Sequence, residues 1–488
     1  MAGKILERMV EYSMCAKVVK TARLRILSHT KTFDETIEIY NAALSFYVET
    51  VEREWDLVEG ESLEACVRIL ERLTHRTKKN PSPRYDFDAR FYKFPSYLRR
   101  AAIAEAVGHV SSHKSRLAAW ERRRQKACEK GRKFYEKPPT LNLKPRSFPV
   151  LYKENMWQKT SDGSARIKVF EKNDWVWIDV VYSTRNLASS GNYRFEGFKE
   201  RNPALVRKGK KYFLHVAYEA RVDLVPEAKI ERVVGVDRGL GRVAVCACLD
   251  ENGTVVGRRF VDRPIEKDRL NRQLGRIAKA ASRSGTGEKP NLWRKANNLQ
   301  RAIVQKSADE IVAFARETGA DAIVFEHLGK MRVPKGARGA RRLRAKLQHW
   351  AKAALYEAVL QKAHAEGIRV YRVLARGTSM YAFDGSGEIA ARSNGGKIAL
   401  FQSGKRYDAD LNAAYNITAR YFIKQILKAL PETTRSQAEA NVPSLAERTA
   451  HTLSSLIRLR EVVGMSRRAS ASRRQEREAP SIADGLGG

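Results

Sequence analysis

The order of apolar segments in residues 231–430 constrains the fold of this chain more than any other feature. Three apolar segments follow one another and predict three strands, in VVGVDRGL, RVAVCACLDENG and TVVGRRFVD. Helices at about 264–283 and 291–319, a strand in AIVFEHL, a helix at about 343–366, a strand in IRVYRVL and a last helix from near Ala409 come next. Strands and helices that alternate in this way predict an α/β domain.

This element order is that of an RNase H-like fold, and three carboxylates occupy positions that can meet at one sheet edge. Asp237 ends the first strand, Glu326 ends the fourth strand, and Asp410 stands at the start of the last helix. Carboxylates gathered at one edge repel one another unless divalent cations lie among them. Magnesium prefers oxygen ligands, and two such ions about 4 Å apart can activate a water and stabilise the leaving oxygen of a phosphodiester. These three acids are therefore the candidate catalytic and metal-binding residues.

Each acid alone also has a simpler explanation. An Asp followed by Arg-Gly after a strand, as at Asp237, is most often part of a turn, and the helix dipole favours an acid such as Asp410 in a first turn. Glu326 is less usual, because a carboxylate on an apolar strand needs a partner or a metal. Asp408 is the second choice for the third acid, since it lies outside the helix pattern. The argument for a metal site rests on the three acids together.

The charge of the chain indicates a polyanionic partner. The sequence contains 92 Lys and Arg against 55 Asp and Glu, a formal net charge of +37. Residues 431–488 hold 9 Lys or Arg and 7 Asp or Glu, so +2 lies there and +35 lies in residues 1–430. Such an excess causes self-repulsion in a folded protein, and nucleic acid is the usual partner that relieves it. The size of the chain and its 7 Trp and 18 Tyr argue against a ribosomal protein.

Other classes of protein are excluded by local sequence. No apolar stretch is long enough to span a bilayer, and the N-terminal segment lacks the apolar core of a signal peptide. The five cysteines form no C-x-x-C pair, which favours a reducing compartment over a disulfide framework. We therefore expect a protein of the prokaryotic cytoplasm with no membrane partner, and a monomer is favoured.

Residues 1–230 divide by pattern into three parts. A basic strand is predicted at 14–28, helices within 31–137, and the strands of a small β-barrel or β-sheet within 138–230. If the opening strand belongs to the β-rich part, the helical part is an insertion within it. Basic clusters occur in both parts and are either nucleic-acid contacts or solvated faces. They are Arg122, Arg123, Arg124 and Lys126 in the helical part, and Lys208, Lys210 and Lys211 in the β-rich part.

Three motifs resemble those of a known nuclease family. GVDRGLGRVAV, IVFEHLGKM and DADLNAAYNITARYF are similar to the three RuvC motifs of TnpB, the transposon-encoded RNA-guided nuclease, and of the miniature type V CRISPR effectors. The sharp matches cover roughly residues 231–425. The resemblance implies that Asp237, Glu326 and Asp410 are the catalytic acids, that two magnesium ions are the cofactor, and that guide RNA and target double-stranded DNA are the partners.

The resemblance also implies a multidomain α+β architecture. In layout, residues 1–30 correspond to a wedge strand, 31–137 to a helical recognition domain, 138–230 to a wedge domain and 231–430 to an RNase H-like (RuvC) nuclease domain. Where the family has two C-x-x-C pairs that form a zinc ribbon, the stretch at about 378–408 has neither cysteine nor histidine. We therefore expect a zinc-less remnant of the ribbon. Residues 431–488 are expected to be a mostly disordered tail with one helix around 443–463.

The sequence thus predicts an RNA-guided DNA endonuclease of the miniature type V effector class, with three alternatives. A TnpB-type nuclease is one, but the missing ribbon and the sizeable helical insertion favour a CRISPR effector. An RNA-guided silencer that binds without cutting is another, and the intact set of acids favours the nuclease. A transposase or resolvase that uses no guide is the third, and charge spread over the whole body fits a large RNA–DNA cargo better.

Overall fold

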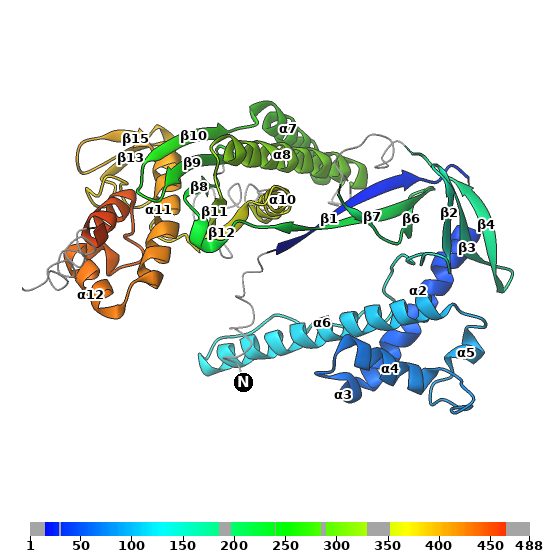
Figure 1. The fold of residues 1–488 in the computed structure, drawn as a ribbon. Coiled ribbons are helices and arrows are strands. Elements are labelled where there is room, and N and C mark those ends of the chain that lie inside the picture. Colours follow the sequence, from blue (N-terminus) through cyan, green and yellow to red (C-terminus); the bar gives the residue numbers. More distant parts are fainter. Residues whose placement is uncertain are drawn as a thin grey trace, which may run out of the picture. The chain divides into compact units, whose positions relative to one another are not determined.

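The computed structural model describes residues 15–28, 31–184, 197–239, 241–284, 289–328 and 352–464 (Figure 1). Two compact units are present, one of residues Val19–Ala220 and one formed mainly by Arg221–Gly488. The beginning of the helix predicted at 343–366 and the end of the predicted tail, from residue 465, lie outside the described residues. Within the described part of the chain, no helix combines the length and the apolar composition needed to cross a membrane.

The Val19–Ala220 unit contains five helices in its described part. They are α2 (Thr32–Arg53), α3 (Trp55–Val58), α4 (Leu63–Thr74), α5 (Phe87–Arg90) and α6 (Ser96–Glu129). Helix α6 is 34 residues long and buries Leu98, Ala102, Ile103, Ala106 and Val110 at helical spacing. The buried positions stop at His113, so the last turns of α6 have no apolar face to hold against a core.

The strands of this unit form two sheets. One contains β1 (Cys15–Arg25), β7 (Lys211–Asp223), β5 (Lys199–Glu200) and β6 (Ala204–Lys208), and the other has the order β2 (Trp157–Ser161), β3 (Ser164–Glu171), β4 (Asp174–Val181). A bridge between Ile26 and Tyr182 joins them. Of the small β-barrel or β-sheet that we expected, the described strands form these two linked sheets. The helices and both sheets share one core, in which Tyr40, Phe87 and Trp175 are buried together with Leu214.

The second unit is built on a five-stranded mixed sheet. Its order is β10 (Val255–Val261), β9 (Ala244–Asp250), β8 (Arg232–Asp237), β11 (Ala322–His327), β12 (Arg369–Leu374). Strand β9 is antiparallel to both β10 and β8, while β11 is parallel to both β8 and β12. Strand β8 is central and buried at four consecutive positions, which explains its continuous apolar sequence. The strand order along the chain agrees with the sequence prediction.

Helices cover both faces of this sheet. Helices α7 (Pro264–Ser284), α8 (Pro290–Glu317) and α10 (Lys352–Ala365) follow β10 and β11, and α8 and α10 pack on the face that carries Val234, Cys246 and Phe325. Helix α11 (Ala409–Ala429) packs on the opposite face against Val233, Ala247 and Val324. A three-stranded sheet of β13 (Ala391–Ser393), β14 (Ile398–Leu400) and β15 (Arg406–Asp408) leads directly into α11.

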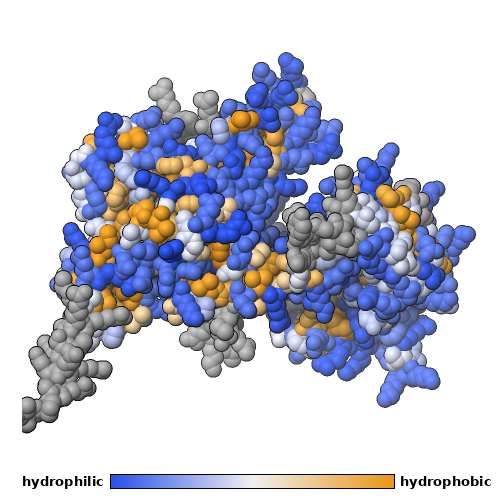
Figure 2. All heavy atoms as spheres, turned by 45° about the horizontal axis from the view of Figure 1, so that its top comes forward, coloured by the Kyte–Doolittle hydropathy of each residue, from blue (hydrophilic) through white to orange (hydrophobic). Residues whose placement is uncertain are grey.

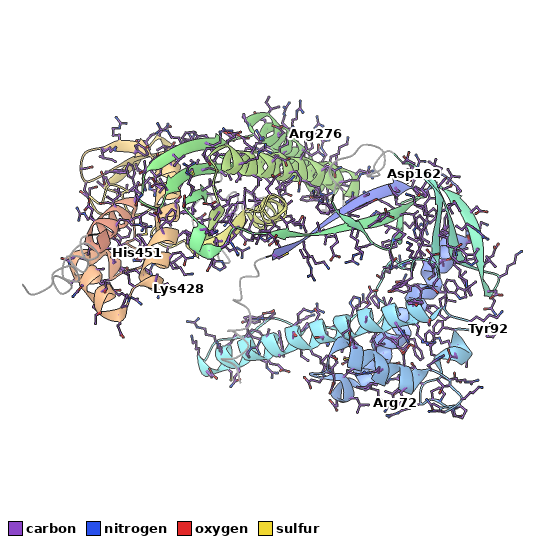
Figure 3. The ribbon with its side chains drawn as sticks, in the orientation of Figure 1. Arg72, Tyr92, Asp162, Arg276, Lys428 and His451 are labelled. Carbon is purple, nitrogen blue, oxygen red and sulfur yellow. The ribbon has the colours of Figure 1, made fainter. Side chains whose placement is uncertain are left out.

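Three buried polar side chains on α11 bind the backbone of neighbouring segments. Asn412, Asn416 and Arg420 stand four residues apart on one helix face and are at most 4% exposed. Asn412 and Asn416 each donate to the carbonyl oxygen of Tyr381. Arg420 donates to the carbonyls of Leu374, Arg376, Thr449 and His451, the last of which is labelled in Figure 3. This α11 polar face therefore fixes the segments 374–383 and 449–453.

In residues 431–464, the helix expected around 443–463 is found at 453–464, and the residues before it form regular structure where we expected disorder. This part forms α12 (Glu432–Asn441), a short 3-10 turn (Pro443–Leu445) and a helix at 453–464. Leu453, Leu456, Leu459 and Val463 are buried in the same core as α11. Their spacing of three and four residues gives the last helix an apolar face.

Candidate active site

Asp237 and Glu326 lie side by side at one edge of the five-stranded sheet. Strands β8 and β11 are parallel and pair Phe325 with Val236. The next position of that register places Glu326 next to Asp237, where both strands end. Glu326 is buried at 7% exposure. Two carboxylates that are distant in sequence are thus neighbours in the fold, as the sequence predicted.

Asp410 is brought towards this pair by a close contact between α11 and β8. Gly235 is the contact point, since a Cβ atom there would overlap the hydroxyl of Thr418 and lie 2.5 Å from the carbonyl oxygen of Ala414. The helix backbone can approach the strand only because residue 235 has no side chain. Asp410 stands in the first turn of α11, and its Oδ2 atom would be 3.8 Å from a Cβ at Gly239, in the loop after β8.

The electrostatics of Asp237 show that the acids influence one another. Burial raises the pKa of Asp237 well above its usual range, and the carboxylates of Glu326, Asp410 and Asp408 raise it further. The pKa of Asp410 is also raised, first by burial and then by Asp408, against the lowering effect of nearby cationic side chains. A carboxylate that ionises here does so against three like charges, which is the situation a divalent cation relieves.

Asp408 has a role that its position outside the helix pattern did not reveal. Its Oδ1 atom accepts hydrogen bonds from the backbone N–H groups of Asp410 (3.1 Å) and Leu411 (3.0 Å), so it is the N-cap of α11. Its Oδ2 atom lies 2.6 Å from Nη1 of Arg242, and the same Nη1 is 3.7 Å from Oδ2 of Asp410. One guanidinium is therefore shared between the two carboxylates.

The donor set fits magnesium in chemistry and in charge. The side chains that would hold the ions are Asp237, Glu326 and Asp410, with Asp408 beside them, and all offer the carboxylate oxygens that Mg²⁺ prefers. As the side chains stand, no three Asp, Glu, His or Cys groups of the described residues are arranged to enclose an ion. The side chains of Asp408 and Asp410 are instead paired with Arg242.

The predicted basic clusters belong to the other unit. Arg122, Arg123, Arg124 and Lys126 are exposed near the end of α6, and Lys208, Lys210 and Lys211 are exposed at the turn between β6 and β7. Arg123 is paired with Glu136 at 2.7 Å, which leaves its neighbours better suited to an external anion. Hydrophilic residues dominate the face of the molecule seen in Figure 2. The clusters remain predicted nucleic-acid contacts.

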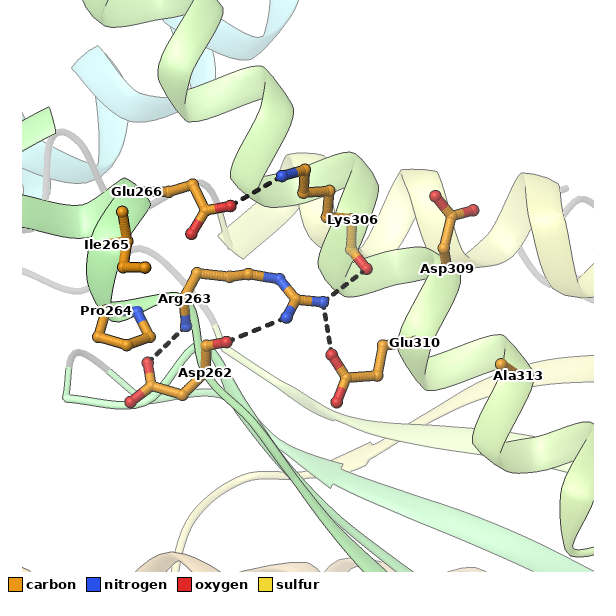
Figure 4. Close-up of a pocket in the computed structure, with 9 residues that line it drawn as sticks. All are labelled: Asp262, Arg263, Pro264, Ile265, Glu266, Lys306, Asp309, Glu310 and Ala313. Atoms are coloured by element: carbon orange, nitrogen blue, oxygen red, sulfur yellow. Dashed lines mark hydrogen bonds and ion pairs between the residues drawn. The ribbon is translucent and has the colours of Figure 1, made fainter. Parts of the chain in front are cut away.

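A hollow beside α7 and α8 of the second unit is a weaker candidate site than the acids. It has a volume of about 640 Å³ and is lined by the end of β10 and by α7 and α8, including Arg263, Lys306 and Glu310 (Figure 4). Its charged side chains are largely committed to one another, since Lys306 pairs with Glu266 at 2.8 Å and Arg263 pairs with Glu310. These pairs hold α7 and α8 to the sheet and leave few charges for a ligand.

An aromatic cluster lies in the segment in which we expected a zinc-less ribbon remnant. Phe383 packs against Phe401, Tyr407 and Tyr415 with ring centroids 5.0 to 5.5 Å apart. Ala382 and Ala399 are fully buried beside these rings. The carboxylate of Asp384 accepts hydrogen bonds from Ser386 and Ser403. Apolar packing and these bonds supply a cross-link between the loops that cysteines and a metal would otherwise supply.

We therefore predict that the folded protein needs no zinc. A structural zinc site requires about four Cys or His ligands, and residues 378–408 contain none. Elemental analysis of the purified protein should find no stoichiometric zinc, and a chelator that removes zinc but spares magnesium should leave both the melting temperature and the activity unchanged. One tightly held equivalent of zinc would contradict the prediction.

Several residues of the site were not anticipated from the sequence. Arg242, which neutralises Asp408 and Asp410, follows β8 in a loop with no pattern that marks it. Gly235 did carry a signal, because a glycine inside an apolar strand often marks a close approach of another backbone. Asn412, Asn416 and Arg420 carried one as well, since they recur every four residues in an otherwise apolar helix.

Comparison with known proteins identifies one matching family model and relatives in Aquifex aeolicus. Residues 20–171 match the model of the Aq_aa04 family. The chain is 28% identical over 239 residues to a TnpB-like protein, aq_aa05, of Aquifex aeolicus (strain VF5), an alignment that covers 45% of this chain and 78% of that protein. It is 27% identical over 152 residues to the uncharacterized protein aq_aa04 of the same organism, with 28% of this chain and 81% of that protein covered. The resemblance to TnpB-like proteins predicted from the motifs is confirmed.

Solved structures of low sequence identity were also found. The Cas12f1 protein in a complex with sgRNA and target DNA gives a TM-score of 0.42 at 12% identity, with 82% of this chain and 99% of that chain covered. CasPhi-2 (Cas12j) bound to crRNA gives a TM-score of 0.47 at 12% identity, with 82% and 97% covered.

Proposed function

We propose that this chain is an RNA-guided DNA endonuclease of the miniature type V effector class, which cuts DNA at a single site formed by Asp237, Glu326 and Asp410. The observation that carries the proposal is the convergence of these acids. The register of β8 with β11 places Asp237 and Glu326 side by side, and the Gly235 contact brings the start of α11 towards them. The relative named as a TnpB-like protein supports the same class.

The residues of the site have separate roles in this proposal. Asp237, Glu326 and Asp410 would hold two magnesium ions, which when bound activate a water and stabilise the leaving oxygen of the phosphodiester. Asp408 caps α11 and so fixes the position of Asp410 relative to the sheet. Burial of Glu326 limits the competition of bulk water for its carboxylate.

Recognition of the target would be separate from the chemistry. In this class the guide RNA reads the target by base pairing, and the protein binds the heteroduplex through its backbone and reads a short flanking motif. The exposed cationic residues at the end of α6 and at the β6–β7 turn are our proposed backbone contacts. A cytoplasmic location and a monomeric state are part of the same proposal.

A bound guide RNA is the expected result that tests the proposal. Protein purified from its host should carry a defined RNA, because the +35 on residues 1–430 needs compensation by phosphate. If the protein contacts six or more phosphates, affinity for that RNA should fall about 10³-fold or more between roughly 50 and 200 mM salt. The RNA is identified by sequencing, and the complex is then assayed for magnesium-dependent cleavage of a matched target.

Two results would count against the proposal in different ways. Full sequence-specific DNA binding by RNA-free protein would exclude a guide. A complex that binds its matched target but does not cut it with any divalent metal would favour the RNA-guided silencer, which is the second candidate function.

A further inference from the structure

We propose that Arg242 competes with the divalent cation for Asp408 and Asp410, so that the acidic site binds metal only when this guanidinium is displaced. The inference rests on the proposed function, since it concerns the metal site of the nuclease. It assigns to Arg242, a residue outside the three motif acids, the role of a competitor of the metal. The argument depends on where the guanidinium lies, what else holds it, and where it can move.

The guanidinium of Arg242 already occupies the position of positive charge beside two of the acids. Its Nη1 atom is 2.6 Å from Oδ2 of Asp408 and 3.7 Å from Oδ2 of Asp410. Oδ1 of Asp408 is engaged in capping α11, so Oδ2 is the oxygen that remains for an external cation. Arg242 and a metal ion would therefore compete for the same carboxylate oxygen of Asp408 and for the same carboxyl of Asp410.

Arg242 is held loosely enough to be displaced. Its side chain is 30% exposed, and its pair with Asp408 is only partly shielded from water, so the pair stabilises the closed arrangement weakly. A divalent cation carries twice the charge and can contact several carboxylates at once, including those of the neighbouring strand ends. The cation therefore displaces Arg242 from the carboxylates once the cation concentration is high enough.

The guanidinium also makes a contact that can persist when it leaves the acids. Its Cζ atom lies 4.7 Å from the ring centroid of Phe260, in a cation–π contact that does not depend on the acids. Phe260 and Asp408 both line a pocket of about 410 Å³, together with Arg258, Arg406 and Tyr407. Arg242 can therefore leave the carboxylates and remain on Phe260 at the border of this pocket.

The lining of the pocket is cationic, so the pocket itself does not attract Arg242. Arg258 and Arg406 give it an excess of positive charge over the single carboxylate of Asp408. An arginine that moves there gains no new carboxylate partner from the pocket, so only metal binding drives the movement. The structure thus describes a site in which its own arginine sets the cation concentration at which the site fills.

Metal binding can be measured directly, without any activity. The full-length chain, freed of nucleic acid by purification at high salt, is titrated with Mn²⁺ alone, and free Mn²⁺ is followed by electron paramagnetic resonance. Arg242→Ala should bind Mn²⁺ about fivefold more tightly than the wild type, which is the factor expected for the loss of one partly exposed ion pair. Arg242→Lys keeps the charge but not the shared geometry, and its affinity should lie between the two.

Arg259→Ala is the matched control. Arg259 is also an arginine that combines an ion pair, with Glu317 at 2.7 Å, and a cation–π contact, with Phe314 at 5.3 Å. Its removal changes the net charge equally but does not touch the acids, so Mn²⁺ affinity should stay at the wild-type value. Asp410→Asn should weaken binding and thereby show that the measured ion is at the acidic site.

The outcomes separate this inference from the proposed function. Unchanged or weaker Mn²⁺ binding by both Arg242→Ala and Arg242→Lys, with both variants folded by circular dichroism, would overturn it, because Arg242 would then organise the acids rather than compete. Tighter binding by Arg242→Ala in a protein that never cuts DNA would support the inference while the nuclease proposal failed.

Discussion

Replacing Asp237, Glu326 or Asp410 by Ala should abolish DNA cleavage while target binding persists. Each change removes carboxylate oxygens from a site whose members act as a unit, so we expect the cleavage rate to fall by at least about 10³-fold for any one of them. Recognition depends on base pairing and on cationic residues elsewhere, and target affinity should stay the same or increase slightly as negative charge near the DNA falls. A gel-shift and a cleavage assay on one matched target measure both quantities.

Asp237 should show a second effect that the loss of a merely structural residue would not produce. Its folded-state pKa is raised well above the ordinary value, so between these two pKa values the folded protein holds a proton that the unfolded chain releases. The folded protein therefore becomes less stable relative to the unfolded chain as the pH rises through that range and Asp237 loses its proton. Asp237→Asn should melt at a higher temperature than the wild type at neutral pH without magnesium, and the difference should vanish in acid.

The control for these variants is an exposed acid of the same unit. The side chain of Asp309 on α8 is 64% exposed and forms an ion pair with Lys362 on α10. This ion pair involves none of the acids of the site. Asp309→Asn should cut at the wild-type rate and show no gain in stability. If Asp237→Ala, Glu326→Ala and Asp410→Ala all cut at that rate as well, the assignment of the acidic site is wrong.

Gly235→Ala should have the second largest effect, on stability and on activity together. The added methyl group would meet the carbonyl oxygen of Ala414 at 2.5 Å, and a backbone atom in a helix cannot turn away as a flexible side chain can. Helix α11 must shift from β8, at a cost of about 1–3 kcal/mol. Asp410 moves with the helix, and a displacement of about 1 Å at a reacting group can reduce the rate roughly 10²-fold.

A glycine with free space around it provides the comparison. Gly275 lies within α7, and a Cβ atom there would meet nothing within 4 Å. Gly275→Ala should raise stability by about 0.5–1 kcal/mol, because alanine loses less conformational freedom in a helix. Thermal unfolding and cleavage rates of both variants test the pair. A Gly235→Ala protein with wild-type stability and rate would mean that α11 and β8 are not held at this close distance.

The acids could be predicted from the sequence because their positions depend on local elements. Asp237 and Glu326 each end an apolar strand, and parallel neighbours bring such ends to one edge. What could not be predicted depends on contacts between distant segments. Arg242 reaches Asp408 across 166 positions of the chain, and no local pattern encodes that meeting.

The tail from residue 431 shows a different case, in which local sequence predicted one helix but not the rest of the structure. A helix was expected around 443–463, where Leu453, Leu456 and Leu459 form an apolar stripe, whereas composition suggested disorder for the rest of residues 431–488 and missed α12. Such a stripe is buried only if a matching surface exists, and here it shares a core with Tyr421 and Phe422 of α11. A sequence taken alone does not contain this second half of the interface.

The α11 polar face has a consequence for anyone who wishes to shorten this protein for packaging into a small delivery vector. Arg420 is buried, and burial lowers the pKa of its guanidinium to about 10. Two of its carbonyl partners, those of Thr449 and His451, belong to the segment after α12. A gene truncated before that segment would leave a cation in the interior without half of its acceptors. The shortest version that still folds should therefore include the segment up to at least His451.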